Sequence, residues 1–214
     1  MEKLDLVGLA GAEDKLPGEI SGGMRKRGLA RALVLDPEII LVDEPDSGLD
    51  PVRTAYLNQL LVDLNAQTDS TILIVTHHLG TARSLPDNIG MLFRRNVGPR
   101  EVLLTSEEPV VQQFLHGRRI GPIGMSEEKD SAQMEAEMAE FQRLGGDASQ
   151  VGTFVDPQLE PSEGLPARSA VARRKSRVMR DFHTLPTKAQ QAITDSLSES
   201  ERDGYAASLS PTGT

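Results

Sequence analysis

Two short apolar runs in the first half of the chain predict neighbouring strands. Residues 39–42 read Ile-Ile-Leu-Val, and residues 71–75 read Thr-Ile-Leu-Ile-Val. Runs of this length, rich in β-branched residues, are typical of strands buried on both faces of a parallel sheet. Between them, Asp50 and Pro51 suit an N-cap and first helical residue, and leucines at helical spacing predict a helix to about Asn65. Strand, helix and strand in this order predict a βαβ unit.

The remainder of the first 123 residues continues the alternation of helices and strands. We expect a short helix over residues 2–12 and a second over 24–35, which Asp36-Pro37 ends because proline disfavours helix at the preceding residue. Further elements are expected at 80–85 (helix), 89–94 and 101–105 (strands) and 109–115 (helix).

The pattern changes near Gly124. Residues 124–144 predict an acidic helix, and residues 145–166, rich in Gly, Pro, Ser and Asp, are typical of a linker. Residues 167–198 predict a basic helical tail with a break at Leu185-Pro186. We expect residues 199–214 to be disordered.

Composition narrows the classes of function. The net charge of −9 and the 3% of aromatic residues argue against a nucleic-acid partner, which phosphate contacts and base stacking would favour. The absence of cysteine excludes disulfides and thiolate metal sites and fits a reducing cytoplasm. No apolar stretch approaches the roughly 18 residues of a membrane span, so we expect membrane association only through partners.

The candidate catalytic and metal-binding residues lie where the predicted strands end. Asp43 and Glu44 close the first strand, at the sheet edge where open α/β sheets bind ligands. A Mg²⁺-nucleotide site needs one carboxylate toward the metal and a second for the attacking water, which suits Asp43 and Glu44 respectively. His77 follows the second strand and would emerge on the same edge. An acidic turn and a structural histidine are the alternative interpretation of these residues taken singly.

Further motifs surround these strands. Ser21, Gly22 and Gly23 open the second predicted helix, where glycines and free N–H groups admit a phosphate. Ser47, Gly48, Leu49 and Asp50 follow the acids, and Thr76 precedes the histidine.

The order of these motifs resembles that of ATP-binding cassette (ABC) ATPases over roughly residues 1–123. Residues 20–24 match the signature motif, 40–44 the Walker B motif, 47–50 the D-loop and 76–77 the switch loop. The resemblance implies an α/β fold, a partial P-loop NTPase (ABC) fold with a parallel sheet and part of the helical subdomain, followed by a helical or disordered tail.

The resemblance also implies roles. Asp43 would support Mg²⁺ through water, Glu44 would be the catalytic base and His77 would sense the γ-phosphate of ATP. The signature residues Ser21, Gly22, Gly23 and Met24 would contact ATP held by an opposite subunit, and the D-loop residues Ser47, Gly48, Leu49 and Asp50 would couple the two sites of a dimer.

A finer resemblance is to the ATPases of Mce- and Mla-type lipid transporters, carried by SGGMRKR, EPDSGLDPV and the stretch from Gly98 to Asp130. It implies an ATP-hydrolysing subunit that energises lipid import through transmembrane permease subunits and Mce-type lipid-binding proteins. The location would be cytoplasmic, peripheral at the inner face of the cell membrane.

The sequence departs from the ABC pattern at several points. No GxxxxGK[ST] phosphate-binding loop occurs among the 214 residues, so ATP and Mg²⁺ binding would need a missing half or a partner. The spacings at Arg27–Ala30 and 94–98 are also short for the family. We therefore expect a truncated copy that binds ATP weakly alone and exposes an apolar face.

Two alternatives stay open. In the first, the chain would be an inactive fragment or a regulatory protein that docks on an intact ABC ATPase. In the second, it would be a non-transport ABC ATPase, which its acidity disfavours.

Overall fold

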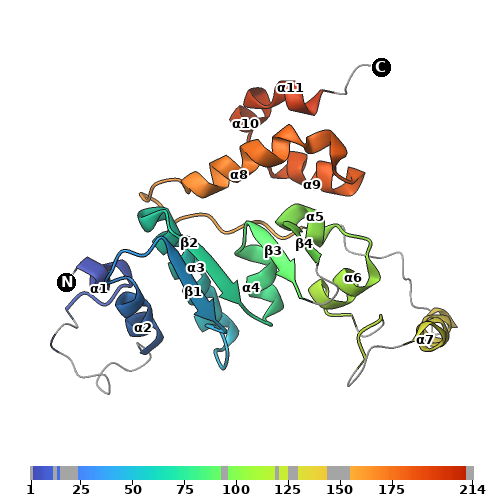
Figure 1. Cartoon of the computed structure of the whole chain (residues 1–214), viewed down its shortest axis with the longest axis horizontal. Coiled ribbons are helices and arrows are strands. Elements are labelled where there is room, and N and C mark those ends of the chain that lie inside the picture. The colour runs from blue at the N-terminus through green and yellow to red at the C-terminus, as the bar shows by residue number, and fades with distance from the viewer. Residues whose placement is uncertain are drawn as a thin grey trace. The chain divides into compact units, whose positions relative to one another are not determined.

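The computed structural model describes residues 2–11, 14, 24–92, 96–118, 121–124, 130–143 and 155–210 (Figure 1). Contacts divide the chain into two compact units, which are described separately. The first contains residues 1–81 and 159–172, and the second contains residues 82–158 and 173–214. The five domains predicted from composition stay a prediction.

The first unit is built on a strand–helix–strand segment, as the sequence predicts. Strand β1 (Ile39–Asp43) pairs in parallel with β2 (Thr71–Val75), and Asp43 lies opposite Val75. Helix α3 (Pro51–Thr68) connects them. Its start is fixed by Asp50, whose side chain accepts the backbone N–H of Arg53 at 2.9 Å. The expected α/β fold with a parallel sheet is therefore confirmed.

One face of this sheet carries the core of the first unit. Helices α1 (Glu2–Leu6), α2 (Met24–Ala32) and α3 contribute to the core, and α3 lies against the sheet (Figure 1). The fully buried members of this core are Val7, Ala30, Leu33, Ile40 and Leu64. Both α1 and α2 end earlier than the sequence predicts.

The opposite face of the sheet is exposed, so the prediction that both strands are buried on both faces is wrong. Ile39 and Leu41 are 62% and 73% exposed, and Leu73 and Val75 are 58% and 55% exposed. Side chains alternate across a strand, and the described residues supply a layer for one side only. The expectation of an exposed apolar face is thereby confirmed.

A segment from the predicted linker region lies along α3 in the first unit. Asp63 accepts the backbone N–H of Ser162 at 2.8 Å and its hydroxyl at 2.7 Å. Gln59 donates to the carbonyl of Glu160 at 2.9 Å. Residues 155–166 form no helix or strand, but these bonds fix their second half on the helix.

The second unit opens with a hairpin and two helices. Strands β3 (Asn88–Met91) and β4 (Asn96–Pro99) are antiparallel. Helices α5 (Arg100–Leu104) and α6 (Pro109–Leu115) follow, and α4 (Leu79–Ser84) crosses the division between the units. Residues 101–105 were expected to be a strand and are mostly helical, because an apolar run of three residues carries no period that separates strand from helix.

The remaining helices are α7 (Ser131–Arg143), α8 (Ser169–Arg180), the short 3₁₀ helix η3 (Phe182–Thr184), α9 (Thr187–Ser196), α10 (Glu199–Gly204) and α11 (Ala206–Leu209). All belong to the second unit except residues 169–172 of α8, which belong to the first. Residues of η3, α9 and α11 pack with the end of α8 around a small core of Met179, Phe182, Ile193 and Leu197, to which α10 contributes no residue. Disorder from residue 199 is wrong as far as residue 209, because Ser198 and Glu201 form a capping box that starts α10.

A buried ion pair joins the tail to the hairpin region of the same unit. Nη1 of Arg174 donates to Oε2 of Glu101 at 2.9 Å, and Nη2 donates to Oε1 at 3.2 Å. Both side chains are almost completely buried. None of the described helices is both long and apolar enough to cross a membrane.

Candidate functional site

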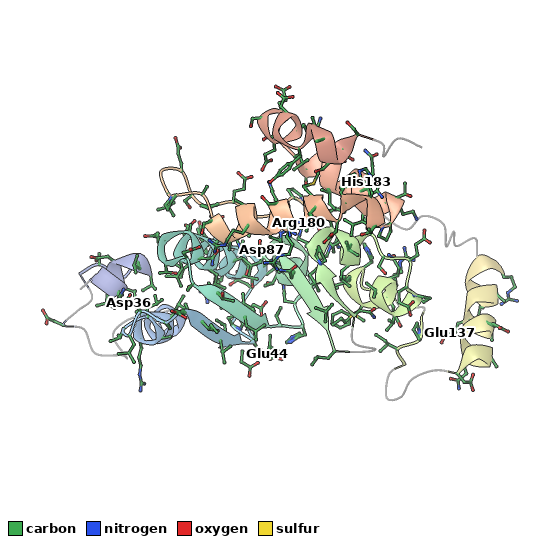
Figure 2. The ribbon with its side chains drawn as sticks, turned by 45° about the horizontal axis from the view of Figure 1, so that its top comes forward. Asp36, Glu44, Asp87, Glu137, Arg180 and His183 are labelled. Carbon is green, nitrogen blue, oxygen red and sulfur yellow. The ribbon has the colours of Figure 1, made fainter. Side chains whose placement is uncertain are left out.

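Asp43 and Glu44 lie at the carboxyl end of β1, and both are exposed. Glu44 is labelled in Figure 2. The backbone N–H of Glu44 donates to the carbonyl of Val75 at 2.8 Å, so the strand pairing extends to the acid. The φ of Glu44 is +41°, in the left-handed region, so the chain turns sharply directly after the pairing ends. This turn presents the carboxylate beyond the sheet edge.

His77 reaches Glu44 from the neighbouring strand. Its Nδ1 lies 3.2 Å from Oε1 of Glu44, and the two side chains are 68% and 48% exposed. Because β1 and β2 are parallel and adjacent, their carboxyl ends meet at one edge. A carboxylate and an imidazole at this distance can share a proton and hold a water molecule between themselves and a bound ligand.

The turn after Glu44 contains the predicted D-loop residues. The backbone N–H of Ser47 donates to the carbonyl of Glu44 at 3.2 Å, and the backbone N–H of Leu49 donates to the carbonyl of Asp46 at 3.1 Å. Gly48 has a φ of +69°, which suits glycine. The turn ends at Asp50, and the backbone N–H of Arg53 lowers the pKa of that carboxyl. Asp50 is therefore engaged as a helix cap in this chain.

The predicted signature residues Ser21, Gly22 and Gly23 lie outside the described residues. Met24 is the first residue of α2. The predicted nucleotide contacts of Ser21, Gly22, Gly23 and Met24 therefore stay a prediction.

One functional candidate escaped the sequence analysis. Asp46, 4% exposed, accepts the hydroxyl of Thr76 at 2.8 and 2.9 Å on its two carboxylate oxygens. A charged residue inside a turn between two motifs has no distinctive spacing, and only the fold shows that it is buried beside the switch loop.

Comparison with known proteins identifies relatives of the chain. The probable ribonucleotide transport ATP-binding protein mkl of Mycobacterium bovis is 66% identical over 204 residues, covering 92% of this chain and 56% of the relative. The protein of the same name from Mycobacterium leprae is 66% identical over 203 residues, covering 92% of this chain and 58% of that relative. This chain is a relative of the ABC ATP-binding proteins.

Two further comparisons agree with an ABC assignment. The intermembrane phospholipid transport system ATP-binding protein MlaF of Escherichia coli K12 is 38% identical over 127 residues, covering 58% of this chain and 47% of that protein. A family model described as "AAA domain, putative AbiEii toxin, Type IV TA system" matches residues 16–83, which include every predicted nucleotide-site residue. The chain spans about half the length of the curated relatives that it matches.

ABC ATPases bind nucleotide and Mg²⁺, and the residues present fit part of such a site. Among the residues that the structure describes, no three acidic or histidine side chains gather closely enough to hold a metal alone. Mg²⁺ in nucleotide sites keeps several waters and takes only one or two carboxylates beside the substrate phosphates. The exposed carboxylate of Asp43 suits that contribution.

Proposed function

We propose that this sequence supplies the hydrolytic half of an ABC-type ATP site. The observation that carries the proposal is the approach of His77 Nδ1 to Glu44 Oε1 at 3.2 Å, at the ends of two adjacent parallel strands. The phosphate-binding loop must come from residues outside these 214, because no GxxxxGK[ST] occurs among them.

Each residue has a distinct role in this proposal. Glu44 accepts a proton from the attacking water, and His77 orients that water and contacts the γ-phosphate. Asp43 holds Mg²⁺ through water. Ser21, Gly22, Gly23 and Met24 face the nucleotide of a second subunit, and Ser47 to Asp50 join the two sites.

The cargo that we propose is a lipid, moved through permease subunits and Mce-type lipid-binding proteins at the inner face of the cell membrane. The names of the relatives differ on this point: mkl is named for ribonucleotide transport and MlaF for intermembrane phospholipid transport. The resemblance of residues 98–130 to the Mce-associated ATPases supports the lipid alternative.

The test is a chimera in which this chain replaces the matched 204-residue region of the M. bovis relative. We expect ATP hydrolysis by the chimera, and a loss of about 100-fold to 10,000-fold in kcat for Glu44→Gln. The control is Glu38→Gln, the same change at an exposed acid immediately before β1, which should retain full activity. A chimera whose Glu44→Gln variant hydrolyses ATP as fast as the control would contradict the proposal.

The lipid alternative needs a separate readout. In cells lacking the relative, the active chimera should restore uptake of a labelled phospholipid and leave uptake of a labelled ribonucleotide unchanged. Restored uptake of the ribonucleotide, with phospholipid uptake unchanged, would favour ribonucleotide transport, for which the mycobacterial protein is named.

A second function is favoured by the exposed face of the sheet. Ile39, Leu41, Leu73 and Val75 would let the chain dock on an intact ABC ATPase as a regulator. In that case the separate chain changes the turnover of the intact relative, and Glu44→Gln in the chain does not alter this effect.

A further inference from the structure

The loop that carries His77 is held at both ends by side-chain hydrogen bonds within the first unit. Its first residue, Thr76, donates its hydroxyl to Asp46, at 2.9 Å from Oδ1 and 2.8 Å from Oδ2. The same hydroxyl accepts the backbone N–H of His78 at 2.9 Å. The hydroxyl oxygen of Thr76 therefore forms hydrogen bonds with Asp46 and with the backbone of His78, on either side of His77 in the chain.

The far end of the loop is held by α4 and α3. The backbone N–H of Thr81 donates to Nδ1 of His78 at 3.2 Å. The hydroxyl of Thr81, which is buried, lies 3.2 Å from Nδ2 of Asn58 in α3. Gly80 keeps this arrangement open, because a Cβ there would lie 3.0 Å from Cε1 of the His78 ring.

Asp46 in turn is fixed by the turn that presents Glu44. The carbonyl of Asp46 accepts the N–H of Leu49 at 3.1 Å, and the carbonyl of Glu44 accepts the N–H of Ser47 at 3.2 Å. The acid and the loop that carries the histidine are thus joined by one short path, from Glu44 through Asp46 and Thr76 to His77.

We propose that Asp46 is a positioning residue that acts through Thr76 to hold His77 beside Glu44. The catalytic consequence rests on the proposed ATPase function, whereas the geometric claim does not. A buried carboxylate is costly unless it is well paired, and among the described residues the hydroxyl of Thr76 donates to both of its oxygens. The carboxylate thereby fixes the position of Thr76, the first residue of the loop that carries His77.

The experiment uses the 214-residue chain with ¹⁵N-labelled histidine and measures the imidazole nitrogen shifts of His77. Glu44→Gln should move these shifts in the otherwise unchanged chain, because Nδ1 lies against the carboxylate. In Asp46→Ala and Thr76→Val backgrounds, Glu44→Gln should move them by less than one third as much. Thr76→Ser keeps the hydroxyl and should retain the full response.

The matched control is Asp63→Ala in the same unit. Asp63 also accepts a hydroxyl, from Ser162 at 2.7 Å, but it lies outside the path to His77. The response to Glu44→Gln should be unchanged in that background. Any general loosening of the unit would affect both aspartate variants alike.

Three results would overturn the proposal: a full response in both Asp46→Ala and Thr76→Val, an equal loss in Asp63→Ala, or no response to Glu44→Gln in the unchanged chain. If Asp46→Ala fails to fold, the comparison of Thr76→Val with Thr76→Ser decides the question alone.

A second readout separates this proposal from the proposed function. In the chimera with the mycobacterial relative, Asp46→Ala should lower kcat by about tenfold and change the KM for ATP by less than twofold, since a misplaced loop impairs the chemical step. A chimera that hydrolyses no ATP contradicts the proposed function, while the nitrogen shifts still decide the role of Asp46.

Discussion

The two compact units differ in how far their apolar and acidic side chains are buried. In the first unit, one whole face of the β1–β2 sheet and the acids at its edge stay open to solvent. In the second unit, the tail encloses its own apolar core, and Glu101 is buried against Arg174. The difference teaches that the described residues of the first unit leave one face of its sheet uncovered, whereas the tail of the second unit supplies its own apolar core and a buried ion pair.

Breaking the buried ion pair should give the largest effect. Arg174→Met leaves the buried carboxylate of Glu101 without its two-pronged partner, and we expect a loss of about 3–5 kcal/mol in unfolding free energy. Urea unfolding can be followed by Tyr205 fluorescence in a Tyr56→Phe background, because these are the two tyrosines of the chain.

The control is Arg177→Met, three residues further along α8 and exposed, which should change the free energy by less than about 0.5 kcal/mol. Similar losses for both arginines would show that the pair is not what anchors the tail. Replacing both partners, with Arg174→Met and Glu101→Leu together, should recover much of the stability.

Substitutions at two neighbouring residues of β1 should distinguish the buried face of the sheet from the exposed face. Ile40 is 4% exposed and packs in the core of the first unit, so Ile40→Ala should cost about 2–5 kcal/mol. Leu41 points to the open face, and Leu41→Ala should cost less than about 0.5 kcal/mol. Amide hydrogen exchange across α3 and β2 measures both. A large cost for Leu41→Ala in the isolated chain would mean that its own residues cover the face.

Acid should weaken the second unit through Glu101. Burial alone raises the pKa of this carboxyl, but the hydrogen bonds and charge of Arg174 outweigh burial and hold the pKa below its ordinary value of 4.5. The unfolded chain therefore takes up the proton first, so the stabilisation is complete above pH 4.5 and falls as the pH drops through the lower folded value.

The measurement is the urea midpoint of the Tyr205 signal between about pH 6 and pH 3, compared with that of Glu101→Gln. The variant should be less stable at pH 6 and should lose less on acidification. Parallel curves would contradict a protective role for the ionised pair.

The sequence predicted the elements whose signals are local. The runs at 39–42 and 71–75, with the Asp50-Pro51 start of α3, led to a parallel βαβ unit, which the structure contains. That Glu44 and His77 meet follows from the same topology. Their catalytic roles stay predictions, as do those of the signature and D-loop residues.

The remaining features depend on what packs against each element. The continuous apolar sequence of β1 is typical of a strand buried on both faces, but it does not indicate which residues would pack against the second face. The burial of Asp46 depends on the switch loop folding over it, which no spacing in the sequence indicates. Helix α5 was mistaken for a strand because its apolar run is short. The capping box of α10 was visible in Ser198 and Glu201 and was overlooked beside the polar composition of the tail.

That capping box gives the smallest of the expected effects. The hydroxyl of Ser198 accepts the N–H of Glu201 at 3.3 Å, and the carboxylate of Glu201 accepts the N–H of Ser198 at 2.9 Å. Ser198→Ala removes one half of this exchange and should cost about 1 kcal/mol of local stability, because α10 buries none of its residues and the cap supports its first turn beside the ion pair of Glu201 with Lys175. Amides of α10 should then exchange about fivefold faster, while those of α8 stay unchanged. Ser208→Ala in α11 is the control and should leave both helices as they are. Faster exchange throughout α8 in Ser198→Ala would mean that α10 and α8 open together as one cooperative part of the second unit, and would contradict a purely local role for the cap.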